Sequence, residues 1–542
     1  MGTLNPSFYW VWIFISGVGA GLASMVYSFQ YLGLVSYFPL LLVLDCINQK
    51  TQYTWKQKII YTILACWGVG SIGAAIANPW MIHSIHVFGH MPWAISVLIT
   101  ALVYGFEITL VLWVCFGFPM MFIKRLEGWD IPFRFCFFLL ADPLYPRLFQ
   151  WSFGGFTFTE TLWIAQVADL VGDWGLGFYS IGFHFLLLLV WRQKIIHSSF
   201  NKPLALGFAG TYVFLLIAGI AYGGWRTTQL QASLTEGEPL NIAAIQPNFS
   251  LQQLASNPDL AYSKREMNIR ALLYDSQQAL EKFDHDSSIP KLLVWPESVY
   301  PFAYLRDLPE RKRIQQFIKR HQTALLFTTI DWNDDPAGHQ FYGTSLLIEN
   351  DGTIQGRYDK IFLIPFGEYI PGGTVFPAYR QWLKKLIPNI SEFKRGEVYT
   401  VFQLSESLSF SGTICFDVFS PAIIRNMVRN GAKLVINLSN LAWFGKTNAT
   451  RQMEMMIRWK AIENRVPFLY LSNNGETMFI NALGEKSGEQ LELFEQGSLS
   501  ETVLLQQHFS IYREYKEWLL AGIFLALLIT TICAHRKGRI FS

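Results

Sequence analysis

The stretch SGTICFDVFSP, residues 411–421, carries a short apolar run into a helical pattern that begins at a proline. Leu408 and Phe410 begin an alternation that continues to Ile414 and is typical of a buried strand. Cys415 stands where that strand ends. A strand that leads at once into a helix favours an α/β fold. This stretch alone leaves three roles open for Cys415: a buried small side chain, half of a disulfide, or a nucleophile. The rest of the chain has to decide among them.

Residues 225–516 repeat this alternation, which predicts a layered α/β domain. Strand-like runs lie at 240–246, 291–297, 324–330, 341–349, 408–416, 433–439, 468–473 and 477–483. Helical patterns fill the gaps, chiefly at 259–283, 308–321 and 449–465. The NGE sequence at 474–476 is a tight-turn signal between the last two strands, and Asp351-Gly352 is another.

Composition separates this domain from the remainder of the chain. Of 542 residues, 51% are hydrophobic and 15% are charged, whereas soluble domains carry about a quarter charged residues. The mean hydropathy is +0.25, and the shortage of charge is localised, which indicates a membrane part beside a water-soluble part. A net charge of +3 is too small to favour nucleic acid as a partner. The sequence has no phosphate-binding glycine loop or zinc-type cysteine spacing, so we expect no cofactor and no metal site.

Eight segments approach the length of about 20 mostly apolar residues that a bilayer-spanning helix needs. They lie at 8–28, 30–46, 58–78, 93–118, 131–149, 163–191, 204–224 and 517–534. The fifth is the least regular because Asp142, Pro143 and Pro146 interrupt it. We therefore expect a polytopic α-helical bundle of about eight spans. The expected parts are a membrane domain at 1–224, a soluble domain at 225–516, and a last helix with its tail at 517–542.

Lysine and arginine residues in the loops set the expected orientation of these spans. They follow the second, fourth, sixth and eighth spans, at Lys50, Lys56, Lys58, Lys124, Arg125, Arg192, Lys194, Lys202, Arg536, Lys537 and Arg539. The loops after the first and third spans carry none. Because basic loops stay in the cytoplasm, we expect both termini there and residues 225–516 on the opposite side of the membrane.

Cysteine usage narrows the role of Cys415, which is the only cysteine in residues 225–516. The others lie in or beside the predicted spans, at Cys46, Cys66, Cys115, Cys136 and Cys533. A disulfide within the soluble domain is therefore excluded. A lone thiol in an oxidising compartment is a liability unless it is buried or used. At this point a buried small residue and a nucleophile are equally acceptable.

A thiol nucleophile needs a base and a positive group near the developing oxyanion. Glu297, in VWPES, ends a predicted strand, and Lys360, in RYDKIFLIPFGEYIP, precedes an apolar run. Glu368 follows eight residues later. Any one of these charges, taken alone, is most often a solvated surface residue. Together an acid, a lysine and a cysteine occur in this order, each near the end of a predicted strand.

This Glu–Lys–Cys order resembles the nitrilase, or carbon–nitrogen hydrolase, superfamily, which implies a four-layer αββα sandwich for the soluble domain. With seven spans before that domain and one after it, the chain resembles the apolipoprotein N-acyltransferase family of bacterial membrane enzymes. The resemblance implies N-acylation of the diacylglyceryl-cysteine at the N-terminus of apolipoproteins. The acyl donor would be a phospholipid, with phosphatidylethanolamine expected, and transfer would pass through a cysteine thioester in two steps.

The resemblance also implies roles for single residues. Cys415 would be the nucleophile, Glu297 the general base and Lys360 the stabiliser of the tetrahedral intermediate, with Glu368 and Asp417 in support. The loops NLAWFGK (440–446) and SNNGET (472–477) would line the mouth of the site. The substrate-binding residues expected there are Asn440, Trp443, Phe444 and Asn474. Location in the bacterial inner membrane is implied, with the catalytic domain in the periplasm, and a monomer is expected.

The sequence departs from the family pattern at two places. Phe416-Asp417 stands where the family commonly has Tyr-Glu, and Leu441 stands where an aspartate is usual. Asp417 is one methylene shorter than glutamate, so any contact it makes to the triad must be rebuilt or lost. These departures bear on the rate and on acceptor preference, because the three triad positions are intact.

Two other functions remain open on the sequence. The first is a membrane-anchored amidase that uses the same triad with water as acceptor, and the second is a catalytically inactive membrane scaffold. His83, His86 and His90 have a spacing that metal ligands can use, although a loop without metal is favoured. Glu107, inside a predicted span, indicates an internal polar partner. In the helix at 449–465, Arg458, Lys460 and Arg465 are expected to face solvent or lipid headgroups.

Overall fold

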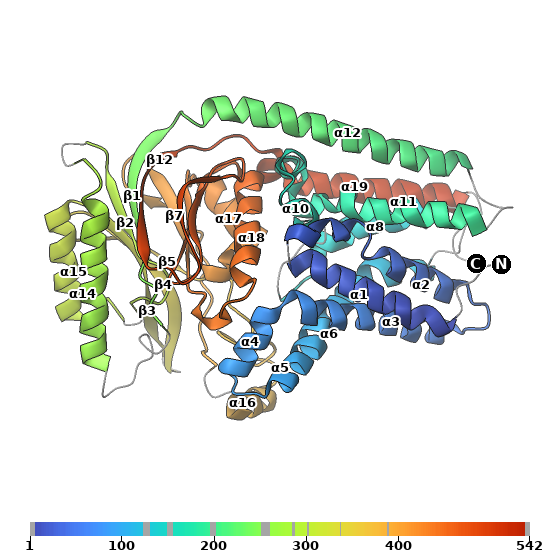
Figure 1. The fold of residues 1–542 in the computed structure, drawn as a ribbon, viewed down its shortest axis with the longest axis horizontal. Coiled ribbons are helices and arrows are strands. Elements are labelled where there is room, and N and C mark those ends of the chain that lie inside the picture. Colours follow the sequence, from blue (N-terminus) through green and yellow to red (C-terminus); the bar gives the residue numbers. More distant parts are fainter. Residues whose placement is uncertain are drawn as a thin grey trace. The chain divides into compact units, whose positions relative to one another are not determined.

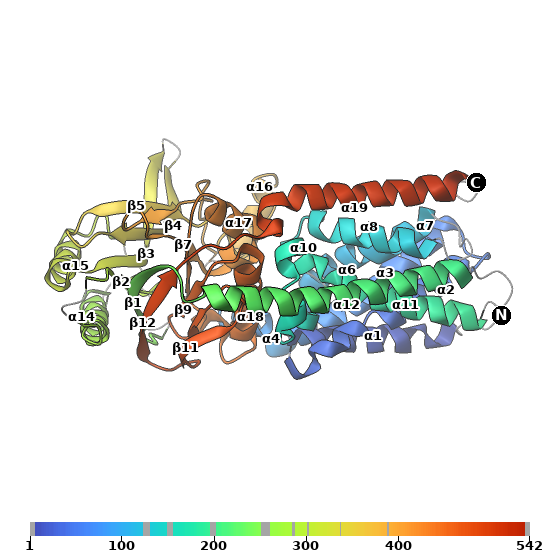
Figure 2. The ribbon, with the colours of Figure 1, turned by 90° about the horizontal axis from the view of Figure 1, so that it is seen from above.

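The computed structural model describes residues 6–25, 27–122, 130–148, 155–195, 202–250, 261–284, 288–300, 303–335, 338–386 and 390–536. Its internal contacts divide the chain into two compact units. Residues 1–228 and 510–542 form the first, and residues 229–509 form the second. The ribbon views show the first unit as helices and the second as strands with flanking helices (Figures 1 and 2).

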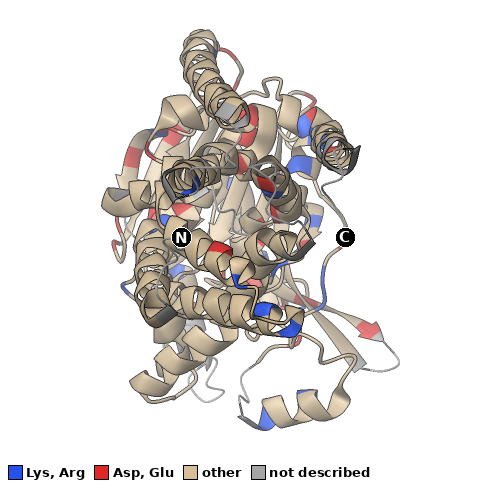
Figure 3. Cartoon of the chain, turned by 90° about the vertical axis from the view of Figure 1, so that its right-hand side faces the viewer, with Lys and Arg blue, Asp and Glu red and all other residues tan. Residues whose placement is uncertain are grey.

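The described residues of the first unit are mainly helical. Its main helices are α1 (Tyr9–Met25), α2 (Phe38–Gln49), α3 (Trp55–Ala77), α4 (Pro79–Val87), α5 (Trp93–Ile99), α6 (Gly105–Leu112), α7 (Pro119–Phe122), α8 (Asp130–Leu144), α9 (Leu162–Ala165), α10 (Ala168–Gly175), α11 (Gly177–Ile195), α12 (Lys202–Ser233) and α19 (Ile511–Arg536). Lys, Arg, Asp and Glu are sparse along these helices (Figure 3). This composition suits a membrane environment.

The number of spans differs from the expectation. Among the described residues, four helical segments are long and apolar enough to cross a membrane: Ser28–Gln49, Trp55–Ala77, Trp93–Gly117 and Ala205–Ser233. The pair α10 and α11, bent by 56°, makes a fifth if it counts as one span. The fifth predicted span falls on α8, which has only 15 residues and contains Pro143. Several apolar helices are therefore present, and the expected count of about eight is not confirmed.

Small residues and paired charges hold the first unit together. A Cβ atom at Gly17 would lie 2.8 Å from Ile72 Cβ, so α1 and α3 approach closely, as membrane helices with small residues do. Arg192 donates to Asp130 Oδ1 at 2.8 Å and also pairs with Asp45, and all three side chains are buried. Charged side chains are tolerated in the interior of a helix bundle when they pair with one another in this way.

Two polar residues that the sequence singles out, Glu107 and His86, have local partners. Glu107 accepts a hydrogen bond from the backbone N–H of Leu148, which is an internal partner of the kind expected. His86 Nδ1 lies 2.7 Å from the carbonyl oxygen of Met91. Within the described ranges, no group of three or more His, Cys, Asp or Glu side chains is arranged to hold a metal ion.

The second unit contains two six-stranded sheets. One has the order β12-β1-β2-β3-β4-β5 and the other the order β11-β10-β9-β8-β7-β6. The strands are β1 (Glu238–Gln246), β2 (Lys291–Val294), β3 (Ala324–Asp335), β4 (Gly338–Ile348), β5 (Ile354–Asp359), β6 (Phe402–Gln403), β7 (Ser409–Ile414), β8 (Val435–Ser439), β9 (Phe468–Ser472), β10 (Thr477–Ile480), β11 (Lys486–Leu491) and β12 (Gly497–Leu505).

Helices cover the outer face of each sheet. α14 (Ala261–Leu280) and α15 (Leu308–His321) lie on the first sheet, and α17 (Pro421–Arg429) and α18 (Ala449–Asn464) on the second (Figure 1). The inner faces pack on each other, as Ser345 Oγ of β4 donates to the carbonyl of Gly412 in β7 at 3.1 Å. Strands buried on both faces are often apolar runs, as KLLV of β2 is, whereas β7 (SFSGTI) is buried at every residue although most of its residues are Ser, Gly or Thr. The expected four-layer αββα sandwich is confirmed.

The expectation for the charges of α18 is wrong. Arg458, Lys460 and Arg465 are buried rather than exposed. Lys460 Nζ lies 2.7 Å from Glu463 Oε2 within the same helix, and Arg465 donates to the carbonyl of Ala482 at 3.0 Å. A helix inside a layered domain can bury its charges when each one meets a carboxylate or a carbonyl. The sequence periodicity alone does not reveal those partners.

Candidate active site

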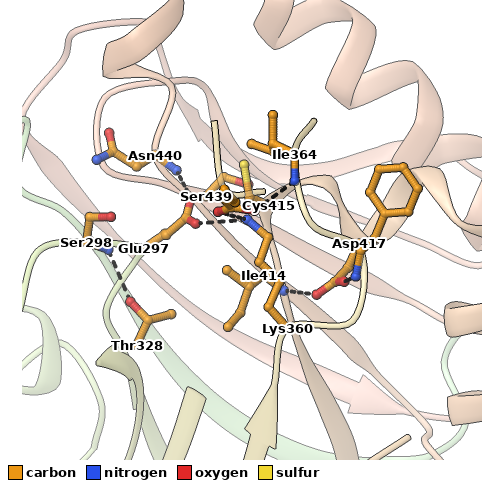
Figure 4. Close-up of polar contacts among 12 residues, drawn as sticks. Glu297, Ser298, Thr328, Lys360, Ile364, Ile414, Cys415, Asp417, Ser439 and Asn440 are labelled. Carbon is orange, nitrogen blue, oxygen red and sulfur yellow. Dashed lines mark hydrogen bonds and ion pairs between the residues drawn. The ribbon is translucent and has the colours of Figure 1, made fainter. Parts of the chain in front are cut away.

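Three strand ends carry the predicted triad in the second unit. Glu297 follows β2 and Lys360 follows β5, both in the first sheet, while Cys415 follows β7 in the second sheet. The three side chains converge, and the Lys360 ammonium lies beside the Glu297 carboxylate (Figure 4). The site is therefore built where the two sheets face each other, from residues up to 118 positions apart in the chain.

The backbone at Cys415 makes a sharp turn. Its φ is +50°, in the left-handed region that costs a non-glycine residue about 1 kcal/mol, and such strain clusters at active sites. Asn437 Nδ2 donates to the Cys415 carbonyl at 3.0 Å and to Thr413 Oγ1 at 3.1 Å, which fixes the turn. Cys415 is 2% exposed, so its thiol is held in a buried and defined position.

Lys360 is surrounded by carboxylates. Its Nζ lies 2.7 Å from Glu368 Oε1 and 3.4 Å from Glu297 Oε1, and the residue is 1% exposed. Burial lowers the pKa of Lys360, but the carboxylates of Glu368 and Glu297 outweigh it and hold that pKa well above its usual value. Lys360 is therefore an ammonium group at neutral pH, suited to stabilise a developing oxyanion.

Glu297 is placed to take the proton of Cys415. One carboxylate oxygen faces Lys360, and the other accepts the backbone N–H of Asn440 at 3.0 Å. Burial raises the pKa of Glu297, the nearby Glu368 raises it further, and Lys360 opposes this. Burial and the Glu297 charge raise the pKa of the Cys415 thiol well above its usual value. The resting site thus holds a neutral thiol next to a carboxylate of increased basicity, which suits general-base catalysis.

Asp417 connects the two halves of the site. Its Oδ2 accepts hydrogen bonds from the Tyr358 hydroxyl at 2.8 Å and the Ile414 N–H at 2.9 Å. Its Oδ1 accepts from the N–H groups of Phe362 at 2.8 Å and Ile361 at 3.3 Å. This short side chain therefore binds the Tyr358 hydroxyl, the backbone just after Lys360 and the backbone just before Cys415, which helps to set the separation of Lys360 and Cys415.

Acidification should weaken this connection. Burial raises the pKa of Asp417 to about 6, while Lys360, the backbone N–H groups and the Tyr358 hydroxyl act in the opposite direction. Below that pH the Asp417 carboxyl group is protonated. One of its oxygens then carries a hydrogen and no longer accepts a hydrogen bond from the backbone N–H group that faces it. We expect the rate of the wild-type enzyme to fall as the pH drops through about 6. In Tyr358→Phe the lost hydrogen bond raises the pKa of Asp417, so the acidic limb of the pH–rate profile should move to higher pH. An unmoved limb would assign it to Glu297 instead.

The four predicted substrate-binding residues differ in their surroundings. Asn440 is buried, its side-chain oxygen accepts the N–H of Ala442 at 3.2 Å, and its carboxamide points away from Cys415 (Figure 4). Phe444 is 6% exposed and packs against Phe416 with ring centroids 5.9 Å apart. Trp443 is 45% exposed, and Asn474 is 3% exposed. The structure brings the triad, Glu368 and Asp417 together, whereas substrate binding by these four residues stays a prediction.

Sequence reasoning missed two residues that fix the site. Asn437 lies inside the buried strand β8, and Tyr358 lies near the end of β5. The polar Asn437 within the apolar run KLVINLS was a usable signal, because a buried carboxamide needs partners. Tyr358 carries no such signal, since tyrosine is common in strands.

Comparisons with known proteins cover both units. Residues 16–186 match the apolipoprotein N-acyltransferase N-terminal domain, and residues 276–505 match the carbon–nitrogen hydrolase domain. The chain belongs to the apolipoprotein N-acyltransferase family. As a member of this family it is an acyltransferase enzyme.

Family relatives align with nearly the whole chain. The apolipoprotein N-acyltransferase of Geobacter metallireducens is 27% identical over 97% of this chain and 95% of its own. That of Borreliella burgdorferi is 26% identical over 93% and 91%. An amidase from Nesterenkonia sp. of known structure covers 53% of this chain and 98% of its own, with 17% identity and a TM-score of 0.37. That structural likeness is too distant to bear on the activity.

Proposed function

We propose that this enzyme transfers an acyl chain from a phospholipid to the α-amine of a diacylglyceryl-modified cysteine at the N-terminus of an apolipoprotein. One observation carries the proposal. A buried thiol, a carboxylate and an ammonium group meet in one site, in a chain whose relatives are named apolipoprotein N-acyltransferases. Phosphatidylethanolamine is the donor that the family suggests.

The first step would acylate the enzyme. Glu297 takes the proton of the Cys415 thiol while sulfur attacks the ester carbonyl of the phospholipid. A C–S bond forms, and the oxyanion is stabilised by Lys360. The ester C–O bond then breaks, and Glu297 returns the proton to the departing alkoxide, which leaves as a lysophospholipid. The product is a thioester on Cys415.

The second step would use the same groups in reverse order. The neutral α-amine attacks the thioester carbonyl, forming a C–N bond, and Glu297 takes the amine proton. When the C–S bond breaks, the proton passes to the leaving sulfur and restores the thiol. Lys360 stabilises the oxyanion again. Because the donor product leaves before the acceptor reacts, ping-pong kinetics are expected.

The thioester must be kept from water, since hydrolysis would make the enzyme a phospholipase. The aromatic side chains expected to shield it are Trp443, Phe444, Phe362 and Phe366. Phe444, packed on Phe416, can support the wall of the site, and the exposed face of Trp443 can contact an acyl chain. These roles are proposed because the two-step route requires a thioester that water does not reach.

Acylation without acceptor tests the proposal directly. Purified enzyme incubated with phosphatidylethanolamine alone should gain the mass of one acyl group on Cys415, and a diacylglyceryl-cysteine peptide should then remove it. Intact-mass measurement before and after the peptide is added follows both steps. An active enzyme that never shows the adduct would contradict the two-step route. Release of free fatty acid at the same rate with and without peptide would indicate a hydrolase.

We also propose that the enzyme is a monomer of the bacterial inner membrane, with residues 225–516 in the periplasm and both termini in the cytoplasm. The distribution of basic residues supports this orientation. An impermeant thiol reagent applied to the outer face should label Glu406→Cys and should not label Lys56→Cys. Both positions are exposed in the structure, so a reversed pattern would overturn the orientation.

A further inference from the structure

Three buried polar atoms of the segment 470–476 have no hydrogen bond within the usual distance among the residues that the structure describes, although the Tyr470 hydroxyl interacts with the side chain of Thr450. They are the Tyr470 hydroxyl, Asn474 Oδ1 and Glu476 Oε2. Tyr470 is fully buried, Asn474 is 3% exposed, and Glu476 is half-buried. Each of these oxygens can accept a hydrogen bond. Buried polar atoms are normally paired, so three unpaired acceptors in one segment point to a missing donor.

The register of the second sheet places Tyr470 near the nucleophile. Thr413, Asn437 and Tyr470 face one another across β7, β8 and β9, so their side chains share one face of the sheet. Asn437 is the residue that holds the Cys415 carbonyl. Two strand spacings, about 10 Å, therefore separate Tyr470 from the strand that ends at the nucleophile.

Glu476 is fixed against α18 by its backbone. Its N–H donates to Thr450 Oγ1 at 3.1 Å, and the Tyr470 hydroxyl faces the same threonine. Glu454, one helical turn further along α18, is already paired with Lys486 at 3.0 Å and with Arg458 at 3.6 Å.

Glu476 is thus the carboxylate in this cluster with an oxygen left to bind a ligand. Burial and the Glu454 and Glu492 charges raise the pKa of Glu476, while Lys486 and Arg451 lower it. A further positive group would be favourable beside a carboxylate in this setting.

The turn that carries Glu476 packs on a loop that contacts the triad. Leu441 Cδ1 lies 2.9 Å from where a Cβ of Gly475 would be. The residue before Leu441, Asn440, donates its backbone N–H to Glu297 Oε2 at 3.0 Å. Only a few residues therefore separate Glu476 from the loop that holds the Glu297 carboxylate.

We propose that Glu476, together with Tyr470 and Asn474, binds a primary ammonium group of a substrate beside Cys415. An ammonium group offers three N–H donors and one positive charge, which matches three acceptors that include one carboxylate. This inference rests on the proposed function, because both of its substrates carry such a group. The ethanolamine headgroup of the donor and the α-amine of the acceptor are the two sources.

Glu476→Gln distinguishes the two sources because it removes the charge and keeps the shape. The donor arm measures acylation of Cys415 by intact mass, with phosphatidylethanolamine and with phosphatidylglycerol, which lacks an ammonium group. The acceptor arm measures transfer from the acylated enzyme to a diacylglyceryl-cysteine peptide. Glu406→Gln, an exposed carboxylate of the same unit, is the matched control and should equal the wild type in both arms.

One arm alone should respond to Glu476→Gln. Loss of a charged hydrogen bond predicts a fall of about 10- to 100-fold. If the headgroup is bound, acylation from phosphatidylethanolamine falls and acylation from phosphatidylglycerol does not. If the α-amine is bound, donor acylation is unchanged and the apparent KM for the peptide rises. Glu476→Asp, which keeps the charge, should retain more activity than Glu476→Gln in that same arm.

Tyr470→Phe provides a second, independent variant, and a smaller fall in the same arm is expected. The inference is overturned if Glu476→Gln and Tyr470→Phe both match the wild type in both arms. It is also overturned if they slow acylation from both lipids and transfer to the peptide equally, because that pattern indicates a structural role. A wild-type enzyme that forms no adduct and transfers no acyl chain contradicts the proposed function instead.

Discussion

Replacing Cys415 with alanine should abolish acyl transfer while the chain still folds in the membrane. Loss of the nucleophile removes the covalent route, and a fall of at least about 10⁴-fold is expected. No other cysteine lies within residues 229–509 to take over the reaction. Alanine is no more strained than cysteine at a φ of +50°, and the atom removed is small, so the fold should tolerate the change.

The measurement is acyl transfer to a diacylglyceryl-cysteine peptide, with thermal unfolding of the same sample as the check on folding. Cys66→Ala is the matched control, since Cys66 is also a buried free thiol but lies in α3 of the first unit. It should keep wild-type activity. Residual transfer by Cys415→Ala above the level without enzyme would end the assignment of Cys415 as nucleophile.

Lys360→Met should cost both activity and stability. Removal of one oxyanion donor typically lowers the rate by about 10²- to 10³-fold. The substitution also leaves Glu297 and Glu368 close together without their shared ammonium partner. Breaking a buried ion pair by removing one member destabilises a protein by about 3–5 kcal/mol. The variant is therefore expected to unfold at a clearly lower temperature than the wild type.

A double variant separates these two effects. Lys360→Met combined with Glu368→Gln removes one of the two carboxylates that lose their ammonium partner, so part of the lost stability should return. Activity should stay low, because the oxyanion still has no ammonium donor. Rates and unfolding temperatures of the single and double variants are compared in one detergent. Recovery of activity in the double variant would show that Lys360 acts through folding and not on the intermediate.

The parts of the site that could be predicted are those that follow buried strands. The apolar run before Glu297 and the run before Cys415 correspond to β2 and β7, which lie inside the sandwich. The helical pattern expected at 308–321 coincides with α15, whose Ile314 and Ile318 are buried against the first sheet. Each of these three elements packs against the hydrophobic core. Such packing leaves a periodic pattern of apolar residues, which can be recognised in the sequence.

The parts that could not be predicted depend on distant pairing. β11 is exposed at five of its six residues, so it carries no apolar pattern and is ordered by its partner β10. β12 pairs with β1, more than 250 residues earlier in the chain. The four hydrogen bonds of Asp417 and the burial of Lys460 arise in the same way. The local sequence shows only that Asp417 and Lys460 are charged, and the fold is needed to show which groups they contact.

The pairing of β1 with β12 brings the two ends of the sandwich together. Glu238 lies opposite Leu505 in an antiparallel pair, where facing Cα atoms are about 4.5–5.5 Å apart. A bridge of a few residues could therefore join them, and the chain could be opened instead at the exposed residue Glu406. The resulting circular permutant would consist of the second unit alone, and its folding without detergent would test whether the sandwich is independent of the helical unit.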